Sequence, residues 1–197
     1  MKKLHKPNGI SRRKFIGGAL ASALSFTIVP RSVLGGAGFV APSDKIVLGY
    51  IGLGKLANDT LLPRFIENDG TQVIAGVDVD AKKTQRFVDK VNKHYSDQNM
   101  SDYKGCHGYS DFREVLAMKD IDAVIVATPD HWHAIPTIQA AKSGKDIYCE
   151  KPLSHTIAEG KAMVKAVRDN WRVLQTGSMQ RSWRDFRHAA ELVRNGY

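Results

Sequence analysis

The sequence predicts an α/β protein built on a doubly wound parallel sheet, and three observations predict it. Short β-branched apolar runs alternate with amphipathic stretches from Lys45 onward, a glycine-rich turn follows the first run, and polar segments follow two later runs. Continuous apolar strands separated by helices indicate a mostly parallel sheet that is covered on both faces. The first apolar run is therefore expected to be a strand of this sheet, and the glycine-rich turn is expected to connect it to a helix.

The strands and helices follow from the pattern in chain order. Apolar runs predict strands at 46–51, 72–77, 121–127, 146–149 and 173–176. Amphipathic stretches predict helices at about 56–68, 80–95, 111–118, 131–143, 156–170 and 183–195. Thr156 and Glu159 have the spacing of a capping box at a helix start, and Ser143-Gly144 suits a helix end.

The basic charge of the chain is concentrated at its amino-terminal end. The whole chain has 29 Lys+Arg and 20 Asp+Glu, a net charge of +9. Residues 1–41 hold seven basic residues and no acidic ones, so the remainder carries 22 minus 20, or +2. A basic excess confined to a removable end does not indicate nucleic-acid binding by the folded part. No nucleic-acid partner is expected.

This basic end has the features of an export signal. Ser11-Arg12-Arg13-Lys14-Phe15-Ile16 precedes a weakly apolar run at 17–29, and paired arginines before a bulky apolar residue resemble the twin-arginine consensus. We predict that residues 1–41 are a twin-arginine signal, cleaved between about 35 and 42, that delivers the protein to the periplasm through the twin-arginine export machinery. A run of about 13 apolar residues is short for a membrane span, but a retained, uncleaved anchor stays open.

Neither cysteines nor histidines form a recognisable metal or disulfide pattern. Cys106 and Cys149 are too few for a disulfide-stapled scaffold, and their spacing does not show whether they pair. His131 and His133 suggest a metal pair, but at a helix start their side chains point apart, and no Cys-x-x-Cys or carboxylate cluster accompanies them. No metal is expected.

The turn after the first strand has the pattern of a dinucleotide-binding turn. Gly52 permits the tight turn, Gly54 lets a pyrophosphate approach the backbone, and the small Ala57 lets the helix lie close to the strand. Asp78 ends the second strand 24 residues after Gly54, where an acidic side chain can accept hydrogen bonds from an adenosine ribose. Such an acid would repel a 2′-phosphate, which favours NAD over NADP. Lys82 and Lys83 leave NADP open.

Two polar segments follow later strands at the edge where open α/β sheets bind ligands. They are Ala127-Thr128-Pro129-Asp130-His131-Trp132-His133 and Tyr148-Cys149-Glu150-Lys151-Pro152. With the glycine turn, and in this order, they resemble the Gfo/Idh/MocA oxidoreductases, the family of glucose-fructose oxidoreductase and inositol dehydrogenase. The resemblance covers residues 45–197. It implies an NAD(P)-binding Rossmann domain at 42–180 and a linking helix at 181–197.

The resemblance also implies the roles of the residues in these segments. Thr128, Pro129 and His133 would line the cofactor, and Glu150 and Lys151 would lie beside the nicotinamide, with Pro152 in a cis peptide. In the family this lysine contacts the substrate hydroxyl and takes part in proton transfer, so Lys151 is the predicted catalytic residue. An ammonium in a partly desolvated cleft can relay a proton or stabilise an alkoxide. The alternatives are a surface lysine in a turn and a Glu150 that only supports the loop.

A third segment leaves the sheet at the same edge. Gln180 and Arg181 follow the last strand, and in the family this segment passes the nicotinamide side of the cleft. Both are candidates for contact with cofactor or substrate, because the arginine fork can hold polar oxygens through two hydrogen bonds. An Arg181 that caps a carbonyl or pairs with Asp185 is an equally good interpretation.

The predicted activity is that of an oxidoreductase. It would transfer a hydride between a bound nicotinamide cofactor and a secondary alcohol of a sugar, cyclitol or glycoside. Family members continue into a second α+β domain with an Asp-x-x-x-His element, which this chain, ending at Tyr197, does not contain; His188 does not match that element. An NAD-dependent glycosidase and a non-catalytic NAD-binding module remain alternatives. The oligomeric state stays open, a homo-oligomer included.

Overall fold

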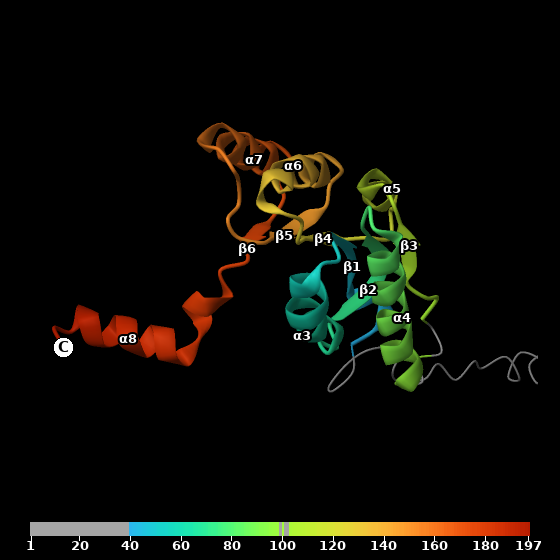
Figure 1. Cartoon of the computed structure of the whole chain (residues 1–197), viewed down its shortest axis with the longest axis horizontal. Coiled ribbons are helices and arrows are strands. Elements are labelled where there is room, and N and C mark those ends of the chain that lie inside the picture. Colours follow the sequence, from blue (N-terminus) through green and yellow to red (C-terminus); the bar gives the residue numbers. More distant parts are fainter. Residues whose placement is uncertain (1–39, 99, 101–102) are drawn as a thin grey trace, which may run out of the picture. The chain divides into compact units, whose positions relative to one another are not determined.

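The computed structural model describes residues 40–98, 100 and 103–197, which are coloured in Figure 1. The contacts within the chain separate residues 1–42 from residues 43–197, and the fold described below is that of the second unit. The predicted export signal lies outside the described residues apart from its last two positions.

One sheet of six parallel strands organises this unit, in the order β3-β2-β1-β4-β5-β6. The order reverses between β1 and β4, the switch point of a doubly wound sheet, so the predicted fold class is confirmed. The strands are β1 (Ile46–Ile51), β2 (Thr71–Val77), β3 (His107–Tyr109), β4 (Ala123–Val126), β5 (Asp146–Cys149) and β6 (Leu174–Thr176).

Helices and short helical turns connect the strands, and α6 and α7 pack side by side (Figure 1). Several begin at a side chain that accepts a backbone N–H, as Asp80 does for α4, Asp111 for α5 and Thr156, with its full capping box, for α7. The segments are η1 (Pro42–Asp44), the π-helical η2 (Ala57–Leu61), α3 (Leu62–Ile66), α4 (Ala81–Asp97), α5 (Phe112–Ala117), η3 (Asp130–Trp132), α6 (Ala134–Lys142), α7 (Ile157–Asp169), η4 (Met179–Ser182) and α8 (Arg184–Arg194).

The core has two halves, one on each face of the sheet. Alternate residues of one strand enter opposite halves: Val124 and Val126 of β4 pack with α5, α6 and α7, whereas Ile125 packs with η2, α3 and α4. Burial on both faces explains why β1 and β4 are nearly continuous apolar runs. The backbone that carries the glycine turn is thus fixed from both sides.

The structure differs from the sequence prediction in two elements. The apolar pattern missed β3, a three-residue edge strand whose middle residue is Gly108 and which pairs only with β2. The helix predicted at 56–68 is a π-helical turn followed by α3. Pro63 lies at the start of α3 and has no N–H to donate, which suits a change of helix type at this point.

The last helix, predicted at 183–195, is present as α8, and none of its residues is buried. Among the described residues, no helix combines the length and hydrophobicity that a membrane crossing requires.

Candidate functional site

The glycine turn between β1 and η2 is shaped so that a ligand can reach its backbone. Gly52 has φ +88°, and a Cβ there would lie 2.8 Å from the backbone of Ala127 and Thr128, so no other residue suits the position. A Cβ on Gly54 would meet no atom within 4 Å. Within the described residues, the N–H groups of Gly54 and Lys55 have no hydrogen-bond partner. The turn therefore offers open space and free donors, which suits a phosphate group.

Asp78, at the end of β2, is held against this turn. Its Oδ2 accepts a hydrogen bond from the Leu53 N–H at 2.8 Å, and its Oδ1 accepts one from the Asp80 N–H at 2.9 Å. A carboxylate oxygen can accept more than one hydrogen bond, so the group can bind backbone and ligand together. The structure thus brings Asp78 to the glycine turn, as the sequence predicts.

A pocket of about 430 Å³ lies beside the turn and is rich in charge. The Lys90 ammonium donates to the Asn58 carbonyl at 2.6 Å. Lys82 and Lys83 line this pocket together with residues of the glycine turn. Arg86 and Lys90, which the sequence prediction did not name, line it as well. Its lining residues are Leu53, Gly54, Lys55, Asn58, Asp59, Asp80, Lys82, Lys83, Arg86 and Lys90.

A second cleft, of about 460 Å³, brings together four of the other predicted site residues. Glu150 and Lys151 follow β5, Gln180 and Arg181 belong to η4, and all four line it. Lys151 is exposed, and the Lys151–Pro152 peptide is cis. The cleft is also lined by Leu56, Thr60, Arg64, Gly177, Ser178, Met179 and Trp183.

Sequence reasoning missed Thr60, Arg64 and Trp183 in this cleft. Thr60 and Arg64 are four residues apart on η2 and α3, so they share one side of that helical segment. Their positions on the first helical segment after the glycine turn were the only signal in the sequence. Buried core residues lie on the same segment, so nothing in the sequence was a reason to select Thr60 and Arg64. Arg181 forms no ion pair with any described residue, so the expected alternative of pairing with Asp185 is not observed.

Glu150 is a buried carboxylate beneath the cleft, with 2% of its surface exposed. Its Oε2 accepts from the Lys151 N–H at 3.1 Å, and its Oε1 accepts from the Tyr148 hydroxyl at 3.4 Å. Burial and the nearby Glu150 carboxylate raise the pKa of Tyr148 to about 12. A Cβ on Gly177 would lie 2.6 Å from the Glu150 carboxyl carbon. Glu150 therefore packs against Gly177, which follows β6, and binds the Glu-Lys-Pro turn, residues 150–152, at the Lys151 N–H.

His133 occupies the other side of that turn. Thr128 and Pro129 belong to the segment at 127–129, the switch-point loop, which packs on Gly52. The His133 ring is 1% exposed. Its Nε2 lies 2.7 Å from the Thr128 carbonyl oxygen and its Nδ1 lies 2.7 Å from the Pro152 carbonyl oxygen. The structure thus places all three residues at the carboxyl edge of the sheet, but the His133 ring lies below the surface and lines neither of the two clefts.

The two cysteines are not joined by a disulfide in the structure. Cys106 and Cys149 are free and buried, and burial raises the pKa of Cys106 to about 12 and that of Cys149 to about 11. Within the part of the chain that the structure describes, no three side chains of His, Cys, Asp or Glu are grouped to hold a metal ion.

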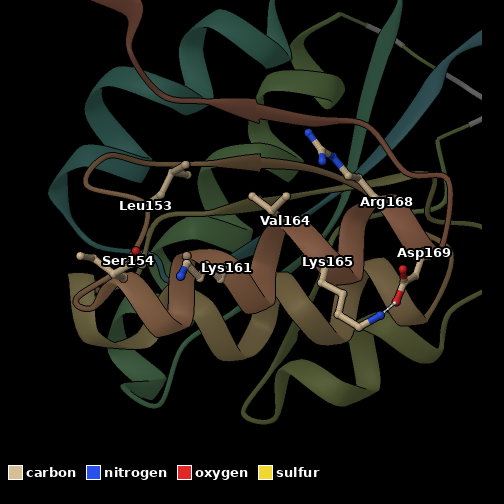
Figure 2. A pocket seen from close by; sticks show the side chains of 9 residues that line it. Leu153, Ser154, Lys161, Val164, Lys165, Arg168 and Asp169 are labelled. Atoms are coloured by element: carbon tan, nitrogen blue, oxygen red, sulfur yellow. Dashed lines mark hydrogen bonds and ion pairs between the residues drawn. The ribbon is translucent and has the colours of Figure 1, made fainter.

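A larger hollow of about 660 Å³ runs along α7, and no predicted site residue lines it (Figure 2). Lys165 and Asp169 form an exposed ion pair at 2.5 Å along this helix. One helix and the loop before it form the hollow. Its residues are Leu153, Ser154, Ile157, Gly160, Lys161, Val164, Lys165, Arg168 and Asp169.

The fold and the two clefts define a dinucleotide-binding domain of the Rossmann type. The model of the oxidoreductase family with an NAD-binding Rossmann fold, Gfo/Idh/MocA, matches residues 46–178. The chain therefore belongs to the Gfo/Idh/MocA family, which confirms the resemblance found in the sequence.

Individual relatives agree with this family. An inositol 2-dehydrogenase of Salmonella typhimurium is 26% identical over 149 residues, which are 75% of this chain and 41% of the relative. A levoglucosan dehydrogenase of Pseudarthrobacter phenanthrenivorans is 52% identical over 60 residues, 30% of this chain and 15% of the relative. The chain spans about two fifths of the length of the first curated relatives that it matches.

Solved structures share the fold. A 3-ketoreductase from Actinomadura kijaniata, crystallised with NADP and TDP-benzene, superposes with a TM-score of 0.66 at 23% identity and covers 77% of this chain and 43% of its own. At that identity the superposition supports the fold and not the substrate.

Proposed function

We propose that this chain is the cofactor-binding part of an oxidoreductase that transfers a hydride between a nicotinamide cofactor and a secondary alcohol of a sugar or cyclitol. The observation that carries the proposal is the common cleft of Lys151, Gln180 and Arg181, placed at the sheet edge that also holds the glycine turn. The relatives named inositol 2-dehydrogenase and levoglucosan dehydrogenase support this substrate class.

The residues of the chain suit a dinucleotide. The free N–H groups of Gly54 and Lys55 and the empty space above Gly54 can take the pyrophosphate, and Asp78 can accept from the adenosine ribose. The nicotinamide end would then lie toward the cleft that holds Lys151. A bound nicotinamide supplies the hydride acceptor and donor that no amino-acid side chain provides.

The side chains around that end have separate tasks in this proposal. The exposed Lys151 ammonium touches the substrate hydroxyl and moves or stabilises its proton as the alcohol is oxidised. Glu150, which is buried and bonded to the Lys151 N–H, keeps the turn in place. Gln180 and Arg181 bind polar oxygens of cofactor or substrate.

For the cofactor we propose NAD in preference to NADP, on the basis of the carboxylate of Asp78 at the end of β2. Lys82, Lys83 and Arg86 line the same pocket and are the groups that could bind a 2′-phosphate. Calorimetric titration with NAD+ and NADP+ separates these outcomes. We expect NAD+ to bind more tightly; tighter binding of NADP+ that is lost in Arg86→Ala would reverse the assignment.

Substitution of Lys151 tests the catalytic part of the proposal. In the protein that turns over a sugar or cyclitol, Lys151→Met should lower turnover by about 10²–10⁴-fold, the range for a lost general acid or base. The dissociation constant of the nucleotide should change little. Lys161→Met, on the outer side of α7, is the matched control and should keep wild-type turnover. Equal turnover in wild type and Lys151→Met would refute the role.

We also propose that the protein is exported by the twin-arginine machinery to the periplasm, on the basis of Arg12-Arg13 before an apolar run. Replacing both arginines with lysine keeps the charge and should leave the protein in the cytoplasmic fraction. Unchanged export of that variant would contradict the route.

A further inference from the structure

His133 makes an arrangement that the roles above do not use. The two ring nitrogens each lie 2.7 Å from a main-chain carbonyl oxygen, one in the switch-point loop and one in the Glu-Lys-Pro turn. The ring is buried, and it neither lines the cleft that holds Lys151 nor the pocket beside the glycine turn. Its partners, Thr128 and Pro152, are 24 residues apart in the sequence.

We propose that His133 is a positioning residue that ties the cofactor side of the site to the catalytic side. The switch-point loop contacts Gly52 of the phosphate-binding turn, and the Glu-Lys-Pro turn carries Lys151. One rigid, buried ring that holds both loops fixes the distance between the bound nucleotide and the ammonium. This inference rests on the proposed function for its catalytic meaning, but the bridge itself is a property of the structure.

Chemistry sets a condition on this bridge. A carbonyl oxygen only accepts hydrogen bonds, so both contacts are hydrogen bonds only when both ring nitrogens carry hydrogen. A neutral ring has one bare nitrogen, which would face a carbonyl oxygen without a proton between them. Each arm of the bridge is therefore a hydrogen bond only where its ring nitrogen carries hydrogen.

The charged groups on the elements around the ring are few. Asp130 and His131 on η3 are exposed, as is Lys151 on the Glu-Lys-Pro turn, whereas Glu150 on the same turn is buried. Thr137, one turn further along α6, is buried and uncharged.

Two conservative variants separate the two arms. The amide nitrogen of asparagine lies near the place of Nδ1 and that of glutamine near the place of Nε2, so His133→Asn keeps the donor toward Pro152 and His133→Gln keeps the donor toward Thr128. We expect His133→Asn to raise the dissociation constant of NAD+ by about tenfold, the loss of one buried hydrogen bond. His133→Gln should raise it less and should instead lower the rate of hydride transfer.

A purely structural histidine would give another pattern. Both variants would then lower the unfolding midpoint, and both would change the dissociation constant and the hydride-transfer rate to the same extent. That result would overturn the proposal. The matched control is Thr137→Ser, a buried change on the same helix that touches neither loop carbonyl, and it should alter neither quantity selectively.

Long-range ¹H–¹⁵N spectra of the labelled chain test the bridge without any ligand. We expect the ring N–H groups of His133 to be hydrogen-bonded to the loop carbonyls of Thr128 and Pro152, and a ring without a hydrogen bond to either carbonyl would overturn the bridge. If the wild-type chain binds no nicotinamide nucleotide, the proposed function fails, whereas these spectra still decide whether the bridge exists.

Discussion

Two buried side chains, at opposite edges of the sheet, each contact two main-chain carbonyl oxygens, but they join different segments. Lys145 begins the segment into β5 and donates to the carbonyls of Met118 and Ile121 at 2.6 and 2.7 Å. His133 contacts two carbonyls at the carboxyl edge. The partners of Lys145 are three residues apart in one loop, whereas those of His133 come from two loops. The first contact joins the start of β5 to a single loop, and the second joins two loops at the carboxyl edge.

Burial of a polar group is therefore not, by itself, evidence of a functional role. Burial lowers the pKa of Lys145, although this residue lies at the amino edge of the sheet, far in the sequence from the predicted site residues of the glycine turn. The informative feature is which segments a buried group joins and whether those segments meet a cleft.

The largest expected effect comes from the glycine turn at the carboxyl edge. Gly52→Ala forces a side chain into the left-handed region and against the switch-point loop, and it should destabilise the fold by about 2–4 kcal/mol. Gly54→Ala is the matched change, because its Cβ enters open space. It should keep the unfolding free energy and weaken nucleotide binding. Urea unfolding and calorimetry measure both, and equal stability of the two variants would contradict the geometry.

At the amino edge, Lys145→Met should act on stability alone. It leaves two carbonyls without their buried donor and should cost about 1–3 kcal/mol of unfolding free energy. The nucleotide dissociation constant of the remaining folded protein should match that of the wild type. A large loss of nucleotide affinity in this variant would break the distinction between the two edges.

Alkaline pH should weaken both halves of the core. Burial raises the pKa of Tyr148 to about 12 and that of Cys149 to about 11, and it also raises the pKa values of Tyr50, Tyr95 and Tyr103. The unfolded chain releases these protons at lower pH than the folded chain, so stability is complete below about pH 9 and falls as the pH rises above it. Each group contributes a slope of up to about 1.4 kcal/mol per pH unit once the pH exceeds its pKa in the unfolded chain, and these slopes add. A constant urea midpoint up to about pH 11 would contradict the burial of these groups.

The smallest effect is expected at the outer side of α7. Lys165→Ala removes an exposed ion pair with Asp169 and should change stability by less than about 0.5 kcal/mol. Nucleotide binding should be unaffected. A clear loss of binding would indicate that the hollow of Figure 2 takes part in the site.

Much of the carboxyl edge could be predicted from the sequence, because local rules determine it. The switch from an apolar run to Gly52 and Gly54, and the position of Asp78 after the next run, are matters of spacing along the chain. The same holds for the capping box at Thr156 and Glu159, which the structure contains. The roles of the individual site residues stay predictions.

The remainder depends on contacts between distant segments, which no local pattern contains. β3 is short and lacks an apolar run, so only its pairing with β2 makes it a strand. Arg64 and Trp183 reach the cleft from elements far apart in the chain. The contacts of His133 with Thr128 and Pro152 required the packing of two loops, which the spacing of a single motif does not specify.

In the proposed function, the carboxyl edge of this sheet binds a nicotinamide dinucleotide through the glycine turn. Calorimetric titration of the wild-type chain and Gly54→Ala with NAD+, with NADP+ as comparison, tests it directly. We expect one site per chain in the wild type and clearly weaker binding in a Gly54→Ala variant of unchanged stability. Absence of binding in the wild type, or equal affinity in both proteins, would contradict it.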